Sequence, residues 1–469
     1  MPYAKSTMTV DNSGNIYLTG MFEDTVFFGG RDNFVVPLDS TDFFIAKINP
    51  DGLLLWTKII SGMGAEWLHD IEVDQAGNTF FIGDYGISLK VDTLYIETGA
   101  GIEVTESYLC KLNPDGKLLK LRRSTENNED IILHDLEIDQ QDNLYLMGRA
   151  RGDKAFNITF NHDSLTDIYS QFVACINKSF EGEWLVTICD SAEILYPGGY
   201  GLSVIKTDPQ DHLYISGYGS GDNDALFISK LKNDGSVIWT DTIHDIIYKI
   251  GGIFTDRDGN VYLTGDDYGF FTKFSPEGEK LWMTMIESRV WTSVVNPDGY
   301  TIATYFHNFG TLDGFIIIDP NGNIIYDYPF EGIEVEQLAM DEAGNIYYNG
   351  YFLDGITVNE EVITTEQGNN YVIGTLKLAE IIGGAQNEAA SHYTSLHLFP
   401  NPVINFMTLK TNQGGSHNLE IITLNGKTVY NDIMQGNDMQ IDMSSFSKGI
   451  YFITIRSKDF VKTEKIIKL

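Results

Sequence analysis

Hydrophobic and polar residues alternate along most of the chain in short runs separated by turn signals. At residues 73–83 the run reads Val-Asp-Gln-Ala-Gly-Asn-Thr-Phe-Phe-Ile-Gly, so an Asp-x-x-Gly-Asn turn separates two alternating segments. A period of two predicts half-buried β-strands, and two such runs across a tight turn predict a hairpin. Asp can accept a hydrogen bond from the backbone two residues on, and Gly supplies the positive φ of the turn.

The same hairpin recurs through the first 378 residues. A second hairpin follows, around turns such as Asn-Pro-Asp-Gly at residues 49–52 and 113–116. Four strands per unit in seven units are typical of a β-propeller, in which radial repetition leaves only short edges. We therefore predict an all-β fold with a seven-bladed β-propeller over residues 1–378. The seven copies start at Asp11, Asp74, Asp139, Asp208, Asp256, Asn296 and Asp341.

The seventh unit lacks an obvious outermost strand. After Tyr371–Leu378 the chain offers only Ala379-Glu380-Ile381-Ile382 before two glycines. Either this piece completes the unit or residues upstream of Met1 do so, and we favour the second interpretation. The segment Met1–Ser6 also lacks the apolar core of a signal peptide, so we expect that signal to be missing from this sequence and to lie upstream.

Four long connections fall on one side of the predicted ring, opposite the tight turns. They are residues 21–42, 84–107, 149–171 and 351–370. Because the seventh unit neighbours the first in a closed ring, we expect these loops to form one contiguous wall. Binding sites are commonly built on such loops.

A second β pattern follows the repeats. Residues 379–395 are rich in small and polar residues without periodicity, which predicts a linker. Residues 396–469 contain short alternating runs that predict a small antiparallel Ig-like β-sandwich.

The repeats resemble the bacterial β-propeller family known as SBBP repeats. The resemblance rests on Val-Asp-x-x-Gly-Asn-x-Tyr-x-x-Gly followed by Phe-x-x-Lys-x-Asn-Pro-Asp-Gly-x-x-x-Trp, over roughly residues 4 to 378. It implies a secreted or surface protein whose ligand, a glycan or a protein, is unknown.

The C-terminus resembles the type A sorting domain of the type IX secretion system. The motifs are Leu398–Pro402, Leu424–Val429, Gly449–Ile453 and Lys462–Leu469. The resemblance implies recognition by the secretion machinery and a secreted or outer-membrane, cell-surface location. The residues it marks as the sorting signal are Pro400, Asn401, Pro402, Gly426, Gly449, Tyr451, Lys465 and Lys468.

Composition narrows the range of partners. The formal net charge is -35, with 66 acidic against 31 basic residues, so the chain repels nucleic acid and anionic membranes. No apolar run reaches the roughly 18 residues of a transmembrane segment. Three cysteines do not make a disulfide framework. We expect no cofactor.

One polar constellation recurs, His69-Asp70 and His134-Asp135, with each His five residues before its turn Asp. The same offset gives Trp291 and Glu336. We expect these residues at the mouth of a central channel, where they would bind a cation or a sugar. The alternative is that they bond backbone groups between adjacent blades.

Motifs for catalysis are lacking. The sequence has no Ser nucleophile elbow, no phosphate-cradling Gly loop and no zinc-spaced Cys and His set, so we assign no catalytic residue and no metal ligand. A binding module is the function we favour. The alternative is a carbohydrate-active enzyme, a glycan hydrolase or lyase, that uses the long-loop face.

Overall fold

The protein is described by a computed structural model whose chain divides into two compact units, Met1–Lys377 and Leu378–Leu469. Within the described residues, no helix has the length and apolar character needed to cross a membrane. The expected linker at 379–395 lies outside the described part. The structure describes residues 7–28, 34–37, 42–64, 66–97, 106–123, 131–150, 170–189, 202–219, 225–243, 250–265, 269–286, 288–306, 314–329, 334–341, 344–352, 356–358, 361–363, 370–378, 396–399, 403, 405–411, 415–423, 427–436, 438–456 and 461–468.

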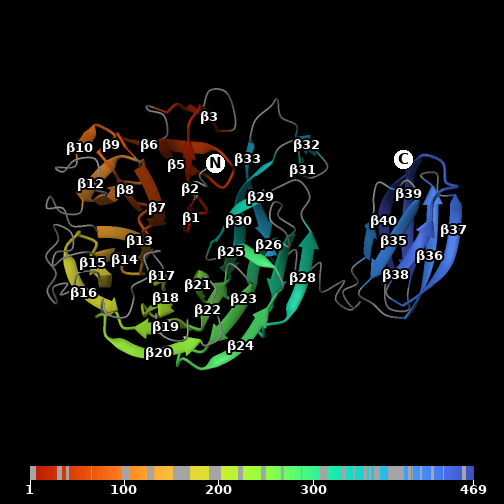
Figure 1. Ribbon diagram of the computed structural model, residues 1–469. Helices are drawn as coiled ribbons and strands as arrows, with labels where there is room; N and C mark the ends of the chain where they lie inside the picture. Colours follow the sequence, from red (N-terminus) through yellow and green to blue (C-terminus); the bar gives the residue numbers. More distant parts are fainter. Residues whose placement is uncertain are drawn as a thin grey trace. The chain divides into compact units, whose positions relative to one another are not determined.

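Among the described residues, the first unit contains seven antiparallel sheets of three or more strands, numbered in chain order (Figure 1), and two short two-stranded hairpins. Sheet 1 contains β1 (Met8–Val10), β2 (Ile16–Phe22), β5 (Asp42–Ile48) and β6 (Leu54–Ser61). Sheet 2 contains β7 (Glu66–Val73), β8 (Thr79–Tyr85), β11 (Glu106–Leu112) and β12 (Leu118–Arg123). Sheet 3 contains β13 (Ile131–Ile138), β14 (Leu144–Ala150), β15 (Ser170–Ile176) and β16 (Gly182–Cys189). Sheets 4 and 5 contain β17 (Leu202–Thr207), β18 (Leu213–Gly219), β19 (Ala225–Leu231) and β20 (Val237–Ile243); and β21 (Ile250–Thr255), β22 (Val261–Gly265), β23 (Phe270–Phe274) and β24 (Lys280–Met285). Sheets 6 and 7 contain β25 (Arg289–Val295), β26 (Thr301–Phe306), β27 (Gly314–Ile318) and β28 (Ile324–Pro329); and β29 (Glu334–Met340), β30 (Asn345–Phe352) and β33 (Asn370–Lys377).

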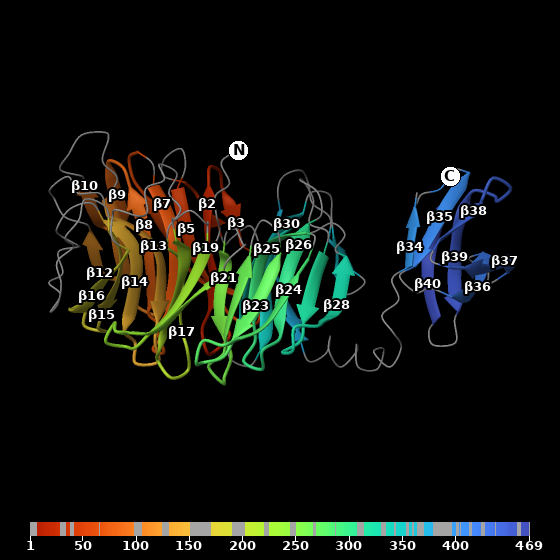
Figure 2. The same ribbon diagram turned by 60° about the horizontal axis from the view of Figure 1, so that its bottom comes forward.

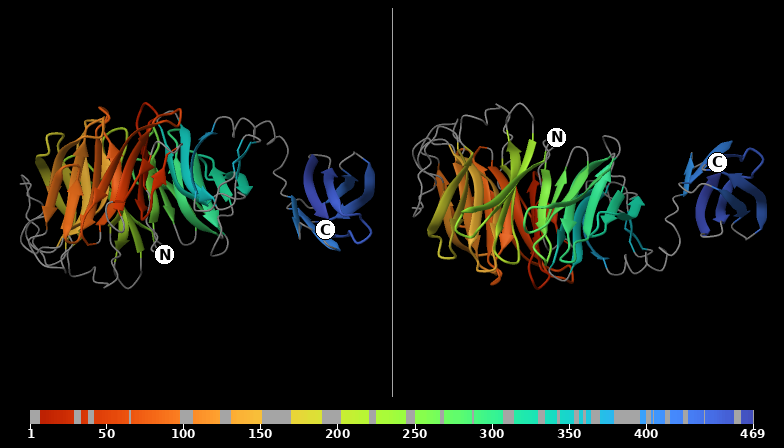
Figure 3. Two further views of the ribbon diagram at one scale, coloured as in Figure 1. Left: turned by 90° about the horizontal axis from the view of Figure 1, so that it is seen from above. Right: turned by 90° about the horizontal axis from the view of Figure 1, so that it is seen from below.

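The first strands of these sheets surround one cavity. Each first strand contacts the first strand of the next sheet, and β29 of sheet 7 contacts β1 of sheet 1. Figure 2 and Figure 3 show the sheets standing side by side. A cavity of about 540 Å³, which we call the central cavity, is lined by the residue just before the turn in every sheet. These residues are Val10, Val73, Ile138, Thr207, Thr255, Val295 and Met340.

The hydrogen bonds of the repeated turn explain why its first residue is Asp. In sheet 5 the Asp256 carboxylate accepts the backbone N–H groups of Asp258 and Asn260 at 3.1 and 2.9 Å, and the Tyr262 hydroxyl donates to it at 3.0 Å. The ammonium of Lys273 on the third strand lies 3.3 Å away. One buried carboxylate therefore fixes the turn and joins three strands, a role that this motif repeats in other sheets.

Neighbouring sheets are joined at their outer edges by indole rings. A Trp on a fourth strand donates its Nε1–H to a carbonyl oxygen in the outer turn of the next sheet. The pairs are Trp56 with Pro114 at 2.9 Å, Trp184 with Asn233 at 2.6 Å, Trp239 with Pro276 at 2.9 Å and Trp282 with Pro320 at 2.9 Å.

Three of the four long connections contain short hairpins. These are β3 (Val26–Phe27) with β4 (Phe34–Val35), β9 (Ser88–Val91) with β10 (Leu94–Glu97), and β31 (Ile356–Val358) with β32 (Glu361–Ile363). Residues 151–169 of the fourth connection lie outside the described part.

The hairpin at residues 88–97 makes a contact that the sequence pattern did not predict. This hairpin pairs with β6 through Ile60 opposite Val91 and Ser61 opposite Lys90, so a loop of sheet 2 extends sheet 1. The side chains of Leu89 and Val91 are fully buried there, and their burial explains why the hairpin folds against a sheet edge.

The second unit consists of two antiparallel sheets around one apolar core. One sheet contains β34 (Leu396–Phe399), β35 (Phe406–Thr411) and β38 (Asp438–Asp442), and the other contains β37 (Thr428–Gln435), β36 (Ser416–Thr423), β39 (Gly449–Arg456) and β40 (Val461–Lys468). Leu409 and Ile441 from the first sheet belong to the same buried cluster as Ile421 and Ile453 from the second.

Candidate functional site

Six first strands carry a β-bulge at the same place. The pairing with the second strand shifts by one residue there, and the skipped residue lies five positions before the turn. A bulge bends the strand and re-aims a side chain, and bulges are common beside functional sites. We call the six residues the bulge ring: His69, His134, Ser203, Gly251, Trp291 and Glu336.

Four residues proposed from sequence, His69, His134, Trp291 and Glu336, therefore occupy equivalent positions in the fold. His134 is exposed and Trp291 keeps 40% of its surface in solvent, whereas His69 and Glu336 are half-buried. Sequence reasoning found the spacing but not the bulges, because a bulge leaves the apolar alternation on both sides of it intact.

His69 is held by a buried carboxylate of its own sheet. Its Nε2 lies 2.7 Å from Oδ2 of Asp84, which is only 4% exposed. The Ser107 hydroxyl also hydrogen-bonds to Asp84, and the backbone N–H of Leu133 in sheet 3 donates to Ser107 Oγ at 3.1 Å. This chain of contacts orients the imidazole and ties sheet 2 to sheet 3.

His134 is neutral at physiological pH. Its side chain touches solvent, yet surrounding protein atoms desolvate the ring, and Arg149 and His69 add positive charge nearby. Together these effects lower the pKa of His134 to about 4. A neutral imidazole can accept as well as donate a hydrogen bond, which suits it to contact polar groups of a ligand.

Asp70 and Asp135 lie between sheets. Asp70 Oδ2 accepts the backbone N–H of Leu136 in sheet 3 at 3.0 Å, and Asp135 Oδ2 accepts that of Ile205 in sheet 4 at 2.8 Å. Burial raises the pKa of both carboxyls, and the pKa of Asp135 reaches about 6. The two aspartates join successive sheets, while the histidines beside them belong to the bulge ring.

A charged cluster lies near the central cavity, and the sequence analysis did not predict it. Lys206 Nζ lies 2.7 Å from Glu137 Oε2, and both residues line the central cavity. Glu72 accepts a hydrogen bond from Thr9 at 3.2 Å, and burial raises its pKa to about 8. Glu72, Glu137 and Lys206, which we call the channel cluster, each stand two residues before a turn Asp. That shared offset was the signal that could have revealed them.

The described residues include no group of three or more His, Cys, Asp or Glu side chains arranged to hold a metal ion. The bulge ring combines an imidazole, an exposed indole and a carboxylate. Such a set can contact the polar groups and the apolar faces of a ligand.

Part of the expected sorting signal lies in the second unit's larger sheet. Gly449 pairs with Lys468, and Phe452 pairs with Lys465. Tyr451 is buried, and its hydroxyl donates to the Ser447 carbonyl at 2.7 Å. The described residues do not include Pro400, Asn401, Pro402 or Gly426.

The chain is thus an all-β repeat protein with propeller-like sheets and a separate C-terminal β unit. Residues 397–469 match the family described as secretion system C-terminal sorting domain. This type IX sorting domain implies export, with the secretion machinery as a partner.

Other comparisons cover larger parts of the chain. The chain is 22% identical over 440 residues to an uncharacterized WD repeat-containing protein L264 of Acanthamoeba polyphaga mimivirus, across 75% of this chain and 30% of that protein's length. Among solved structures, it is similar to the Dos1 propeller, with a TM-score of 0.45, 8% identity, and coverage of 74% of this chain and 89% of that one. It is also similar to a puromycin hydrolase S511A mutant complexed with PGG, with a TM-score of 0.48, 10% identity, and coverage of 87% and 59%.

Proposed function

We propose that this chain is an exported binding protein, secreted or held at the outer-membrane cell surface. Residues 1–378 form a closed seven-bladed β-propeller of the SBBP repeat type, 379–395 a linker, and 396–469 an Ig-like sandwich that addresses the protein to the type IX machinery. The match of residues 397–469 to the sorting-domain family carries the proposal of export.

Closure of the ring is supported by two features of the first unit. Strand β29 contacts β1, and residues from all seven sheets line the central cavity. A closed ring holds its face rigid, which lowers the entropic cost of binding.

The ligand in this proposal is an extracellular glycan or protein that binds over the bulge ring. Trp291 offers an exposed apolar surface, and His134 offers a neutral hydrogen-bonding group. The strong negative charge of the chain, -35, disfavours anionic ligands.

Export is tested by fusing residues 379–469 to a periplasmic reporter in a bacterium with a type IX system. We expect the reporter at the cell surface or in the medium, and retention in the periplasm when Val461–Leu469 is removed. Equal release from a strain without the secretion system would contradict export by this route.

Binding is tested by applying the full chain to arrays of glycans and of surface proteins. Trp291→Ala and His134→Ala should each weaken retention of the bound ligand about tenfold, the effect expected from 1–2 kcal/mol of lost contact. Ile238→Ala, at an exposed position on β20, is the matched control and should bind normally. Retention that does not change in any variant would remove the bulge ring as the binding site.

A further inference from the structure

The first strands of sheets 2 and 3 are fastened to each other beside the bulge ring. Asp70 Oδ2 accepts the backbone N–H of Leu136 at 3.0 Å, and Ser107 Oγ accepts that of Leu133 at 3.1 Å. The bulge residue His134 lies between Leu133 and Leu136. These hydrogen bonds therefore hold the backbone at His134 in a fixed place relative to sheet 2.

Sheets 2 and 3 carry opposite charges at one equivalent position. Asp84 follows the bulge residue His69 by fifteen positions, and Arg149 follows the bulge residue His134 by the same number. Asp84 lies 2.7 Å from Nε2 of His69. Arg149 is exposed, and within the described residues it forms no ion pair. A guanidinium only donates hydrogen bonds, so Arg149 does not hold His134 as Asp84 holds His69, and both groups are open to a ligand.

Trp67 is an indole that does not serve packing between sheets. It is 43% exposed, and no described residue accepts a hydrogen bond from its Nε1–H, in contrast to the four indoles at the outer edges. Trp67 pairs with Asp84, so both side chains project from one face of sheet 2. Ile82 shares that face and belongs to a buried cluster with Leu133 of sheet 3. The indole therefore lies at the junction of sheets 2 and 3, two residues before His69.

Four side chains thus follow one another across this junction. We call Trp67, His69, His134 and Arg149 the mouth row. Burial lowers the pKa of His134, and the charges of Arg149 and His69 add to the shift, so these three groups lie near one another. The row offers an apolar ring at one end and hydrogen-bonding groups at the other.

This combination suits a neutral sugar chain. One side of a sugar ring presents C–H groups, which pack well on the apolar face of an indole. The hydroxyl groups around the ring both donate and accept hydrogen bonds, as a neutral imidazole does, and their oxygens can accept from a guanidinium. The net charge of -35 disfavours sugars that carry acidic groups.

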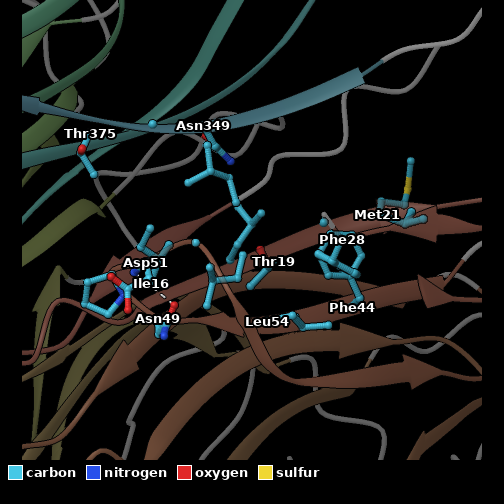
Figure 4. A pocket seen from close by; sticks show the side chains of 18 residues that line it. Ile16, Thr19, Met21, Phe28, Phe44, Asn49, Asp51, Leu54, Asn349 and Thr375 are labelled. Atoms are coloured by element: carbon cyan, nitrogen blue, oxygen red, sulfur yellow. Dashed lines mark hydrogen bonds between the residues drawn. The ribbon is translucent and has the colours of Figure 1, made fainter. Parts of the chain in front are cut away.

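A cavity of about 410 Å³ between sheet 1 and β33 has a different character (Figure 4). Apolar side chains form much of its wall, and Phe28 packs edge-on against Phe44 there, with ring centroids 5.3 Å apart. Hydroxyl groups of a sugar that faced these side chains would lose their hydrogen bonds to water without replacement. The mouth row is therefore the better match for a polar ligand.

We propose that the mouth row binds a neutral oligosaccharide, with one sugar ring stacked on Trp67 and a following ring hydrogen-bonded by His134 and Arg149. His69, which Asp84 orients, lies between the two sugar positions. This inference rests on the proposed binding function of the bulge ring. It adds the class of ligand and two further contact residues, Trp67 and Arg149.

The ligand class is tested by applying the full chain to an array of neutral and uronate-containing oligosaccharides of two to six units. We expect a neutral oligosaccharide to bind, and its longer forms to bind more tightly than the disaccharide, because the row accommodates more than one ring. Binding to acidic oligosaccharides alone, to proteins alone, or to nothing on the array overturns the proposal.

The contact residues are tested by isothermal titration calorimetry with the neutral oligosaccharide that binds most tightly. Trp67→Ala and Arg149→Ala should each raise the dissociation constant about tenfold. Trp67→Phe keeps an aromatic face and should weaken binding less than Trp67→Ala. Unchanged binding in both alanine variants overturns the mouth row as the site.

Leu119→Ala and Arg122→Ala are the matched controls, since both residues are exposed on β12, the outermost strand of sheet 2. Both variants should bind the oligosaccharide as the unaltered protein does. All four altered side chains are exposed, so thermal unfolding followed by circular dichroism should give the same midpoint for each variant. Equal loss of binding in the controls overturns the proposal.

The outcomes separate this inference from the binding function on which it rests. If Trp291→Ala and His134→Ala weaken binding of a ligand but Trp67→Ala and Arg149→Ala do not, the bulge ring remains the binding site and the mouth row is wrong. If none of these four variants changes binding, both proposals fail.

Discussion

The indole nitrogen of Trp239 on β20 donates a hydrogen bond of 2.9 Å to the carbonyl oxygen of Pro276, in the outer turn of the next sheet. The same ring packs against Tyr214 of its own sheet, with centroids 6.0 Å apart. One side chain therefore completes its own sheet and fastens the neighbouring one. As in other repeat folds, stability resides largely in such contacts between neighbours.

Removing this indole should loosen sheets 4 and 5. Trp239→Phe keeps most of the apolar surface but loses the hydrogen bond, so we expect a loss of about 1 kcal/mol. Trp239→Ala also opens a cavity against Gly278 and should cost about 3 kcal/mol. Urea denaturation followed by circular dichroism measures both values.

The control is Trp67→Phe on β7, because Trp67 is 43% exposed. We expect its effect to stay within about 0.5 kcal/mol, as for most surface substitutions. If Trp239→Phe and Trp67→Phe have equal effects, the contact with Pro276 contributes no measurable stability.

The turn carboxylates and their lysines should behave as coupled pairs. Asp256 and Lys273 are both buried and lie 3.3 Å apart. In sheet 6 the same two positions hold Asn296 and Ile317, and Asn296 still accepts the backbone N–H of Tyr300 at 2.8 Å. The chain therefore already contains a neutral version of this arrangement.

We expect Asp256→Asn to preserve the turn but to leave Lys273 without its carboxylate, at a cost of roughly 3 kcal/mol. Adding Lys273→Ile should restore at least 1 kcal/mol, since the double variant copies sheet 6. A double-mutant cycle of chemical denaturation measures this coupling. Simple additivity of the two single effects would contradict the pairing.

The sequence predicted the strands and turns well because both depend on local chemistry. Alternation and the Asp-x-x-Gly-Asn motif predict the hairpins around Asp74 and Asp256. Other features depend on partners distant in sequence. The pairing of Val91 with Ile60 and the ion pair of Glu137 with Lys206 form only once sheets meet. Apolar alternation reveals neither contact, although Glu137 and Lys206 share the same offset from their turn Asp.

The hairpin of β9 and β10 should protect the edge of sheet 1. It pairs with β6 at Ile60 and Ser61, which are both buried. Replacing residues 88–97 by a short Gly-Ser loop exposes that edge, and an open edge promotes association between chains. We expect dimers or larger species at micromolar concentration in size-exclusion chromatography with light scattering.

Shortening the hairpin of β31 and β32 is the matched control, because these strands pair only with each other among the described residues. That variant should remain at the size of the unaltered protein. Association of both variants to the same degree would show that β6 is not the edge responsible.

Glu72 should make stability depend on pH in a direction unusual for a carboxylate. Burial raises its pKa to about 8 in the folded protein, against an ordinary value of 4.5, so the folded state binds more protons between these values. By linkage, the stabilisation is complete below pH 4.5 and is lost as the pH rises toward 8. Lys206 favours the charged carboxylate, and the pKa of about 8 already includes this effect. A change from 4.5 to about 8 corresponds to a loss of roughly 5 kcal/mol across this range, at about 1.4 kcal/mol per pKa unit.

Glu72→Gln removes this titration, so the variant should gain stability relative to the unaltered protein between pH 5 and pH 8. Comparing the two proteins cancels the opposite contribution of His134, whose lowered pKa destabilises the fold as the pH falls from 6.5 toward 4. Urea titrations at several pH values give the difference, and Glu279→Gln, at an exposed position, should show none. A constant difference between Glu72→Gln and the unaltered protein across this range would mean that Glu72 is ionised in the folded state throughout.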